Sequence, residues 1–207
     1  YEHHQQQSLQ QSQHITAALS ALADSRVIWG GDDTVNQIRA IAAKPRSRDI
    51  AFADRYSVAV ISGDVCSDTT SALPVAERLW RDIQPYSQMA CSSPRTLFFL
   101  GDNAQLGYLL QALEQVQGAQ DQNSPDKSIT RQNNHLIAAQ LALATGAAQQ
   151  VTQNRAITAV SVPQFSEAVA NHLYQWHVGD GLLYVTLIKQ LDELPENITT
   201  HCQTVSY

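Results

Sequence analysis

The sequence has few charged residues and no excess of basic ones. Charged side chains make up 15% of the 207 residues, and the formal net charge is -6 at pH 7. A protein with this balance has no positive field that would attract the phosphates of a nucleic acid. We therefore expect no nucleic-acid partner.

Long apolar runs are also absent. No stretch approaches the ~20 apolar residues that a bilayer-spanning helix needs, and nothing resembles a charged leader followed by a hydrophobic signal core. These absences predict a soluble, cytoplasmic protein with no membrane span.

Cysteines are few and widely spaced. The three of them, Cys66, Cys91 and Cys202, form no C-x-x-C pair. An odd number at this spacing indicates neither a disulfide framework nor a zinc site. We expect reduced thiols and no bound metal, with Cys66 and Cys202 as structural residues.

What the chain does contain is an alternation of strand and helix patterns. Apolar residues make up 43% of the sequence, enough for a substantial core. Strands are predicted at 26–29, 57–61, 96–100, 157–162, 182–188 and 202–207, and helices at 8–24, 35–43, 104–117, 136–150 and 165–174. A further helix is predicted after Ser67 and Asp68, which can cap it, with an apolar face that runs from Leu73 to Ile83. This order predicts an α/β domain with a largely parallel sheet flanked by helices, in which sites collect at the carboxyl ends of strands.

Several segments carry more specific expectations. Residues 32–34 are expected to cap the helix that begins at Val35, and residues 46–55 read as a polar connection. Residues 119–127 are the most loop-like part of the chain. The last predicted strand has no element after it, which suggests a piece of a longer polypeptide.

Cys91 is the strongest candidate for covalent chemistry. It lies in Gln-Met-Ala-Cys-Ser-Ser-Pro-Arg at 88–95, between a helix and an apolar strand. A free cysteine is most often a small buried hydrophobe. Here the small and polar neighbours are unlike a core strand, and Arg95 offers a cation that could favour a thiolate. Both interpretations stay open on composition alone.

Gly30 and Gly31 are the second candidate feature. They separate a strand from a helix, so they form either a tight turn or a place where a dinucleotide approaches a helix N-terminus. The acidic pair that follows would repel phosphates, and the full G-x-G-x-x-G fingerprint is absent. His135, His172 and His177 could serve as bases for a cysteine but are assigned no role.

Three motifs together carry a family resemblance. Val-Ile-Trp-Gly-Gly-Asp at 27–32, Asp-Ile-Ala-Phe-Ala-Asp-Arg-Tyr-Ser at 49–57 and the motif at 88–95 resemble, in order and spacing, the acyl-CoA reductases typified by the fatty acid reductase of bacterial luminescence operons. That family is a branch of the aldehyde dehydrogenase superfamily. The resemblance implies an aldehyde dehydrogenase-like catalytic domain at 56–207, preceded at 1–55 by the C-terminal part of a nucleotide-binding region.

The resemblance implies a thioester reduction. Cys91 would attack a long-chain fatty acyl thioester, on CoA or on a protein, and its backbone N–H would stabilise the oxyanion. NADPH would then reduce the acyl-cysteine to a fatty aldehyde, with Gly30 and Gly31 contacting the cofactor. Implied partners are an acyl-protein synthetase and an acyltransferase, and the full-length protein is expected to be a homo-oligomer.

Two departures from the superfamily qualify this picture. The glutamate that activates water in hydrolytic aldehyde dehydrogenases has no counterpart in residues 52–56, where Asp54 is a substitute base or half of an ion pair. Only 90 residues precede Cys91, whereas the family places its first nucleotide-binding strands upstream. We therefore expect a catalytic fragment that binds NADPH weakly and is inactive alone. The alternatives are a non-enzymatic assembly or docking domain and a cysteine acyltransferase or thioesterase.

Overall fold

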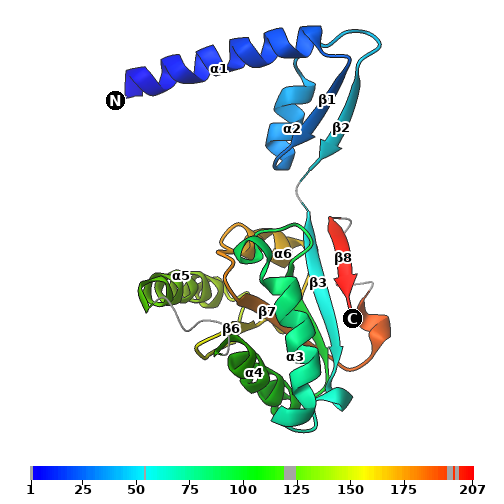
Figure 1. Ribbon diagram of the computed structural model, residues 1–207, viewed down its shortest axis with the longest axis vertical. Coiled ribbons are helices and arrows are strands. Elements are labelled where there is room, and N and C mark those ends of the chain that lie inside the picture. The colour runs from blue at the N-terminus through cyan, green and yellow to red at the C-terminus, as the bar shows by residue number, and fades with distance from the viewer. Residues whose placement is uncertain (1, 54, 119–124, 195–197, 199–200) are drawn as a thin grey trace. The chain divides into compact units, whose positions relative to one another are not determined.

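The chain forms two compact units, Tyr1–Arg55 and Tyr56–Tyr207. The computed structural model describes residues 2–53, 55–118, 125–194, 198 and 201–207 (Figure 1). The first unit contains α1 (Glu2–Leu22), β1 (Ser25–Trp29), α2 (Asp32–Arg39) and β2 (Arg48–Phe52). β1 and β2 pair in parallel, so β1, α2 and β2 form one βαβ unit.

Arg26 ties α2 to the two strands of the first unit. Its Nε and Nη2 atoms donate to the two carboxylate oxygens of Asp49, each at 2.7 Å. Its Nη1 atom donates to the carbonyl oxygens of Ile38 and Ile41, at 3.1 and 2.9 Å. Because these carbonyls lie at the end of α2, one guanidinium satisfies the helix terminus and holds it against the sheet.

The other face of this small sheet is apolar and exposed. Val27 is paired with Ile50 and Trp29 with Phe52, and all four side chains are about half exposed or more. The rings of Trp29 and Phe52 lie 5.8 Å apart between centroids. Parallel strands are usually covered on both faces, so within this unit only the α2 face has its cover.

The first unit corrects four of the sequence-based expectations. α1 begins at Glu2, earlier than predicted, and α2 runs from Asp32 to Arg39 rather than from 35 to 43. Gly31 is the N-cap, with no side-chain cap bond, so the acidic residues expected to cap the helix lie in its first turn. The polar connection at 46–55 contains the strand β2, whose alternation of Asp49, Ile50, Ala51 and Phe52 the charges had obscured.

The second unit is an α/β fold around a six-stranded, mostly parallel sheet. The strand order is β5-β6-β7-β4-β3-β8, and only the β5–β6 pair is antiparallel. The strands are β3 (Tyr56–Ser62), β4 (Pro94–Leu100), β5 (Gln150–Gln153), β6 (Thr158–Ser161), β7 (Leu182–Ile188) and β8 (Cys202–Ser206). The helices are α3 (Thr69–Ile83), α4 (Asn103–Gly118), α5 (Pro125–Ala144) and α6 (Glu167–Tyr174), with short 3-10 turns η1 (Gly63–Val65), η2 (Pro85–Gln88) and η3 (Leu191–Glu193).

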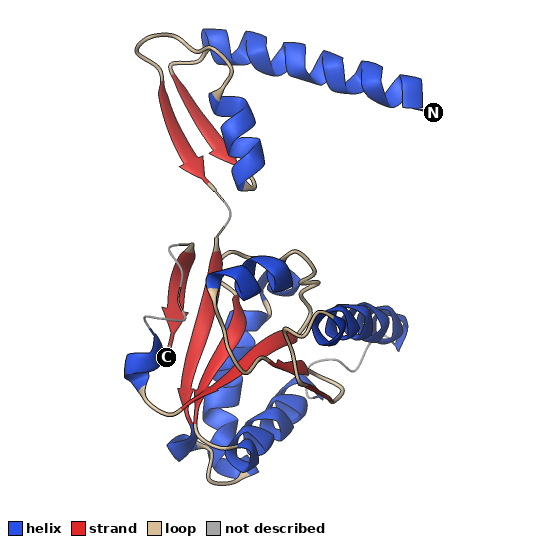
Figure 2. Ribbon diagram, turned by 180° about the vertical axis from the view of Figure 1, so that it is seen from behind, coloured by secondary structure: helices blue, strands red, loops and turns tan. Residues whose placement is uncertain are grey.

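Helices cover both faces of this sheet (Figures 1 and 2). On one face α3 and α4 lie side by side and pack on Leu97, Phe99 and their neighbours. On the other face α5 and α6 pack around Phe98. The central strand β4 is therefore buried on both sides, which explains its continuous apolar sequence.

Two helices and one strand of this unit refine the predictions. α3 is capped by Asp68, as the sequence indicates, with Ser71 completing the capping box. α5 begins at Pro125 and ends at Ala144, whereas the sequence predicted 136–150. The helix ends early because Gly146 takes a left-handed conformation with φ +74°. β5 was not predicted. The loop expected at 119–127 is wrong at 125–127, which belong to α5, and residues 119–124 lie outside the described residues. No helix in the described ranges is long and apolar enough to cross a membrane.

Candidate functional site around Cys91

Cys91 lies in the turn between η2 and the central strand β4. Its side chain is partly exposed, and the strand begins three positions later at Pro94. The cysteine therefore sits at the amino end of β4, rather than at the carboxyl edge where α/β sites were expected. The preceding helix α3 ends at Ile83, close before this turn in the chain.

The two polar backbone groups of Cys91 differ in their hydrogen bonding. Ser57 Oγ, at the start of β3, donates a hydrogen bond of 2.6 Å to the Cys91 carbonyl oxygen. The N–H of Ser93 donates to the carbonyl of Ala90 at 3.0 Å, which closes the turn. Among the described residues nothing accepts a hydrogen bond from the Cys91 N–H.

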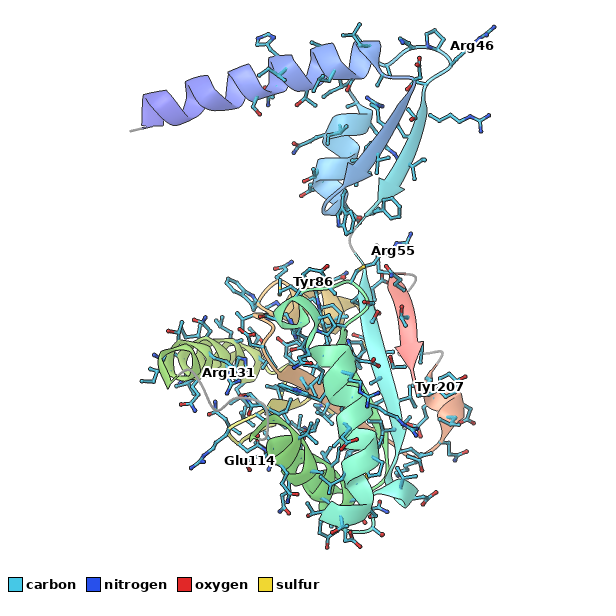
Figure 3. All side chains as sticks on the ribbon, in the orientation of Figure 1. Arg46, Arg55, Tyr86, Glu114, Arg131 and Tyr207 are labelled. Carbon is cyan, nitrogen blue, oxygen red and sulfur yellow. The ribbon has the colours of Figure 1, made fainter. Side chains whose placement is uncertain are left out.

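A left-handed turn precedes the cysteine. Tyr86, Ser87 and Gln88 have φ values of 52°, 53° and 66°, a region that costs a non-glycine residue about 1 kcal/mol or more. Figure 3 labels Tyr86, which is 83% exposed, whereas Gln88 is fully buried. Three successive residues in this conformation require surroundings that hold them there.

Gln88 makes three hydrogen bonds with its side-chain amide. Its Nε2 donates to the carbonyl oxygens of Pro94 and Leu182, at 2.8 and 3.0 Å. Its Oε1 accepts from the N–H of Gly181 at 2.8 Å. One buried amide thus joins the cysteine turn to the start of β4 and to the loop that precedes β7.

The loop before β7 touches the same turn through its backbone. The N–H of Asp180 donates to the carbonyl of Ser87 at 2.9 Å. Gly179 has φ +72°, and a Cβ atom placed there would lie 2.2 Å from the Ser87 carbonyl oxygen. Only glycine fits this contact, because both its conformation and its surroundings exclude a side chain.

Two buried histidines support Gly179 from either side. His135 Nε2 donates to the Gly179 carbonyl at 3.0 Å, so its Nδ1 accepts from the Thr158 hydroxyl at 2.8 Å. His177 Nε2 donates to the Leu182 carbonyl at 2.9 Å, and its Nδ1 accepts the N–H of Gly179 at 3.3 Å. Burial lowers the pKa of His135 and lowers the pKa of His177 to about 3. Both rings are neutral near pH 7.

These bonds exclude His135 and His177 as free bases for Cys91. Each ring already uses its one acceptor nitrogen and its one N–H in the scaffold. His172 lies on α6, with Nε2 3.2 Å from the Thr145 hydroxyl. Burial raises the pKa of the Cys66 thiol, which is fully buried in the core, and burial also raises the pKa of the Cys202 thiol.

Arg95 points to an aromatic ring. Its guanidinium carbon lies 5.7 Å from the centroid of the Tyr174 ring, within range of a cation–π interaction. Tyr174 also shares a 2.7 Å hydrogen bond with Thr96. The arginine of the cysteine motif thus packs against α6 at the amino end of β4.

Gly30 and Gly31 belong to the first unit. The Gly30 N–H donates to the Phe52 carbonyl at 3.2 Å, and the Gly31 carbonyl accepts the first helical bond of α2. A Cβ atom on Gly31 would meet nothing within 4 Å. The space beside Gly31 is thus free of other described atoms, and Asp32 and Asp33 lie in the first turn of the helix.

Two further expectations concern a base and a metal. Asp54, considered as a substitute base, lies outside the described residues. In the part of the chain that is described, no three histidine, cysteine or acidic side chains cluster in a way that could hold a metal ion.

The supporting residues Ser57, Gln88 and Gly179 were not identified from the sequence. Gln88 opens the motif at 88–95 and Ser57 closes the motif at 49–57, but neither motif indicates which residues hold the cysteine turn. The hydrogen bonds of Gln88 to Gly181 and Leu182 join residues that are 93 and 94 positions apart in the sequence, and contacts at such a distance leave no periodic pattern.

Comparison with solved structures places the fold. A substrate-bound Staphylococcus aureus AldH superposes with a TM-score of 0.60 at 12% identity, over 88% of this chain and 40% of that one. The P. syringae AldA indole-3-acetaldehyde dehydrogenase, solved with NAD+, gives 0.54 at 13% identity, over 83% and 37%. Methylmalonate-semialdehyde dehydrogenase from Oceanimonas doudoroffii gives 0.58 at 15% identity, over 86% and 39%. The chain thus spans about two fifths of these aldehyde dehydrogenases.

Sequence comparison identifies the family. The search of curated proteins found no match. The family profile described as acyl-CoA reductase (LuxC) matches residues 8–170, which include all three motifs and Cys91. With most of its length matched and an aldehyde dehydrogenase fold, this chain belongs to the acyl-CoA reductase (LuxC) family.

Proposed function

We propose that this chain carries the nucleophile of an NADPH-dependent reductase that converts a long-chain fatty acyl thioester to the aldehyde. The supporting observation is the state of Cys91: a partly exposed thiol in the family's cysteine motif, with its carbonyl anchored and its own N–H unpaired within the described structure. We assign the acyl transfer to residues 56–207 and a nucleotide contact to residues 1–55.

The geometry at Cys91 supports the first half of the proposed reaction. The thiolate sulfur attacks the thioester carbonyl carbon, and the carbonyl oxygen becomes an oxyanion. The Cys91 N–H is free to donate to that oxyanion, while the bond from Ser57 keeps the peptide carbonyl turned away. Collapse expels the CoA or carrier thiolate and leaves an acyl group on Cys91.

The second half needs a hydride. NADPH, when bound, would supply that hydride and be left as NADP+. The alkoxide formed on the Cys91 thioester carbon would then expel the Cys91 thiolate and leave as the aldehyde. The open backbone at Gly31 fits a close approach by the cofactor, and a neighbouring fold was solved with NAD+. The choice of NADPH rests on the family resemblance.

The surroundings of the thiol favour reduction over hydrolysis. Attack by water on the acyl-enzyme would need a base, and the two buried histidines of this region are fully engaged in holding Gly179. The glutamate of hydrolytic aldehyde dehydrogenases has no counterpart at 52–56. An acyl group on Cys91 would therefore persist until hydride arrives.

Product analysis tests this function. The protein is incubated with tetradecanoyl-CoA, with and without NADPH, and the organic products are separated after trapping of aldehydes. We expect tetradecanal only with NADPH, or a stable acyl-enzyme where this chain lacks the rest of the cofactor site. Rapid release of tetradecanoic acid without NADPH would instead identify a thioesterase, and no reaction at any thiol would favour a docking domain.

A further inference from the structure

The side chain of Gln88 closes the cysteine turn by bonding to a residue at the same distance on the other side of Cys91 in the sequence. Gln88 lies three positions before Cys91, and Pro94 lies three positions after it. The 2.8 Å bond from Gln88 Nε2 to the Pro94 carbonyl therefore joins the two ends of the loop 88–94, with Cys91 at its midpoint. Ser57 holds the midpoint itself through the Cys91 carbonyl.

The chemistry of this closure requires a neutral amide. Pro94 and Leu182 present carbonyl oxygens, which need donors, whereas Gly181 presents an N–H, which needs an acceptor. Glutamine supplies two donors and one acceptor on a single planar group. A carboxylate would lose both donors. An apolar side chain would take one hydrogen-bond partner from each of the three backbone groups, and of these the Leu182 carbonyl would keep His177 Nε2.

The closure also holds strained backbone in place. Gln88 is itself left-handed, and so are Tyr86 and Ser87. Backbone of this kind persists only where the surroundings determine it, and such strain gathers where geometry serves a function. Here the strain ends three positions before the candidate nucleophile, and the bonds that retain it come from Gln88 and from Asp180.

We infer that Gln88 is the positioning residue for Cys91: its amide closes the loop 88–94 so that the thiol and the adjacent N–H meet the thioester carbonyl together. This inference rests on the proposed function, in which Cys91 accepts the acyl group. Gln88 touches no substrate in this role, and its effect passes through the backbone of the loop.

The test compares two reactions of the Cys91 sulfur: acylation by a thioester, which depends on the orientation of the loop, and alkylation, which needs only an accessible sulfur. Gln88→Met removes all three hydrogen bonds at similar volume, and Gln88→Asn keeps an amide one methylene shorter. The matched control is Thr186→Val, which removes a buried 2.9 Å hydrogen bond to the Val162 carbonyl in the same sheet. Each variant is measured for Cys91 alkylation by iodoacetamide and for Cys91 acylation by tetradecanoyl-CoA, under conditions where circular dichroism shows it folded.

In Gln88→Met we expect the ratio of the acylation rate to the alkylation rate to fall about 100-fold, because a small misplacement suffices for such a loss. Alkylation needs only an accessible sulfur and stays within about threefold of wild type. Gln88→Asn should lie between, and Thr186→Val should leave the ratio unchanged. Hydrogen exchange at Gly181 should speed up in Gln88→Met, since its amide loses its acceptor, and should stay unchanged in Thr186→Val.

Three results would overturn the inference. The first is a ratio in Gln88→Met equal to that of the control. The second is failure of both Gln88 variants to fold, which would make Gln88 a residue of the fold rather than of the site. The third is a wild-type Cys91 that is alkylated but never acylated: this refutes the proposed function as well, whereas the first result leaves that function standing.

Discussion

Replacing Gly179 by alanine tests the contact between the loop before β7 and the cysteine turn. A Cβ atom there would lie 2.2 Å from the Ser87 carbonyl oxygen and 3.2 Å from Met89 Sδ. Gly146 is a matched control, because it has nearly the same conformation, φ +74° against +72°, with nothing within 4 Å of its Cβ position. The two substitutions therefore share the conformational cost and differ in the clash.

The magnitudes follow from this difference. An alanine in the left-handed region costs about 1 kcal/mol, and this is the whole expected effect of Gly146→Ala. In Gly179→Ala the Ser87 carbonyl must also move away and lose its 2.9 Å bond from the Asp180 N–H, which adds about 1–2 kcal/mol. At about 2–4 °C per kcal/mol, we expect Tm to fall by about 3 °C in Gly146→Ala and by about 8 °C in Gly179→Ala.

Urea and thermal unfolding followed by circular dichroism at pH 7.5 measure both variants. The acylation rate of Cys91 should fall in Gly179→Ala and stay unchanged in Gly146→Ala, because only the first displaces the turn that carries the thiol. Equal losses of stability in the two variants would refute the packing described for Gly179.

Three other predictions concern acid stability, the first unit and the thiols. Burial lowers the pKa of His177 to about 3 in the folded protein, against about 6.5 in the unfolded chain, and burial also lowers the pKa of His135. Below pH 6.5 the unfolded chain therefore binds more protons than the folded one. The free energy of unfolding should fall there by up to about 1.4 kcal/mol per pH unit for each histidine. A urea midpoint that stays constant from pH 7 to 5 would contradict this. Arg26→Met should speed hydrogen exchange throughout α2 and β2, because Asp49 and two helix-end carbonyls lose their donor, while exchange in β4 and β7 serves as the internal control. Under native conditions iodoacetamide should label Cys91 first and leave Cys66 unlabelled until the core unfolds, so early labelling of Cys66 would show that its burial is wrong.

Local chemistry in the sequence predicted much of the fold. The apolar run at 96–100 marked the central strand, and Asp68 marked the start of α3, because each signal lies within a few residues of its effect. The prediction was wrong where a contact distant in the chain decides the structure. The sequence of β2 looks polar because it contains Asp49, whose partner Arg26 comes from another strand and cannot be seen locally. The end of α5 depends on the left-handed Gly146, which a helical pattern does not reveal.

The candidate site divides in the same way. Cys91 and the family resemblance were visible in one motif, and the proposal about its role still rests on that motif. The neighbours that hold it come from the start of β3 and from residues 179–182, far away in the sequence. A buried glutamine, a left-handed glycine and a neutral histidine are ordinary residues by composition, and only their hydrogen bonds reveal what they support.

Intact mass spectrometry after addition of tetradecanoyl-CoA tests the central claim most directly. The wild-type chain should gain the mass of one tetradecanoyl group, hydroxylamine should remove it as expected for a thioester, and Cys202→Ser should behave as wild type. Cys91→Ser should gain no hydroxylamine-sensitive group. An acyl group that persists in Cys91→Ser on Cys66 or Cys202 would contradict the assignment of Cys91 as the nucleophile.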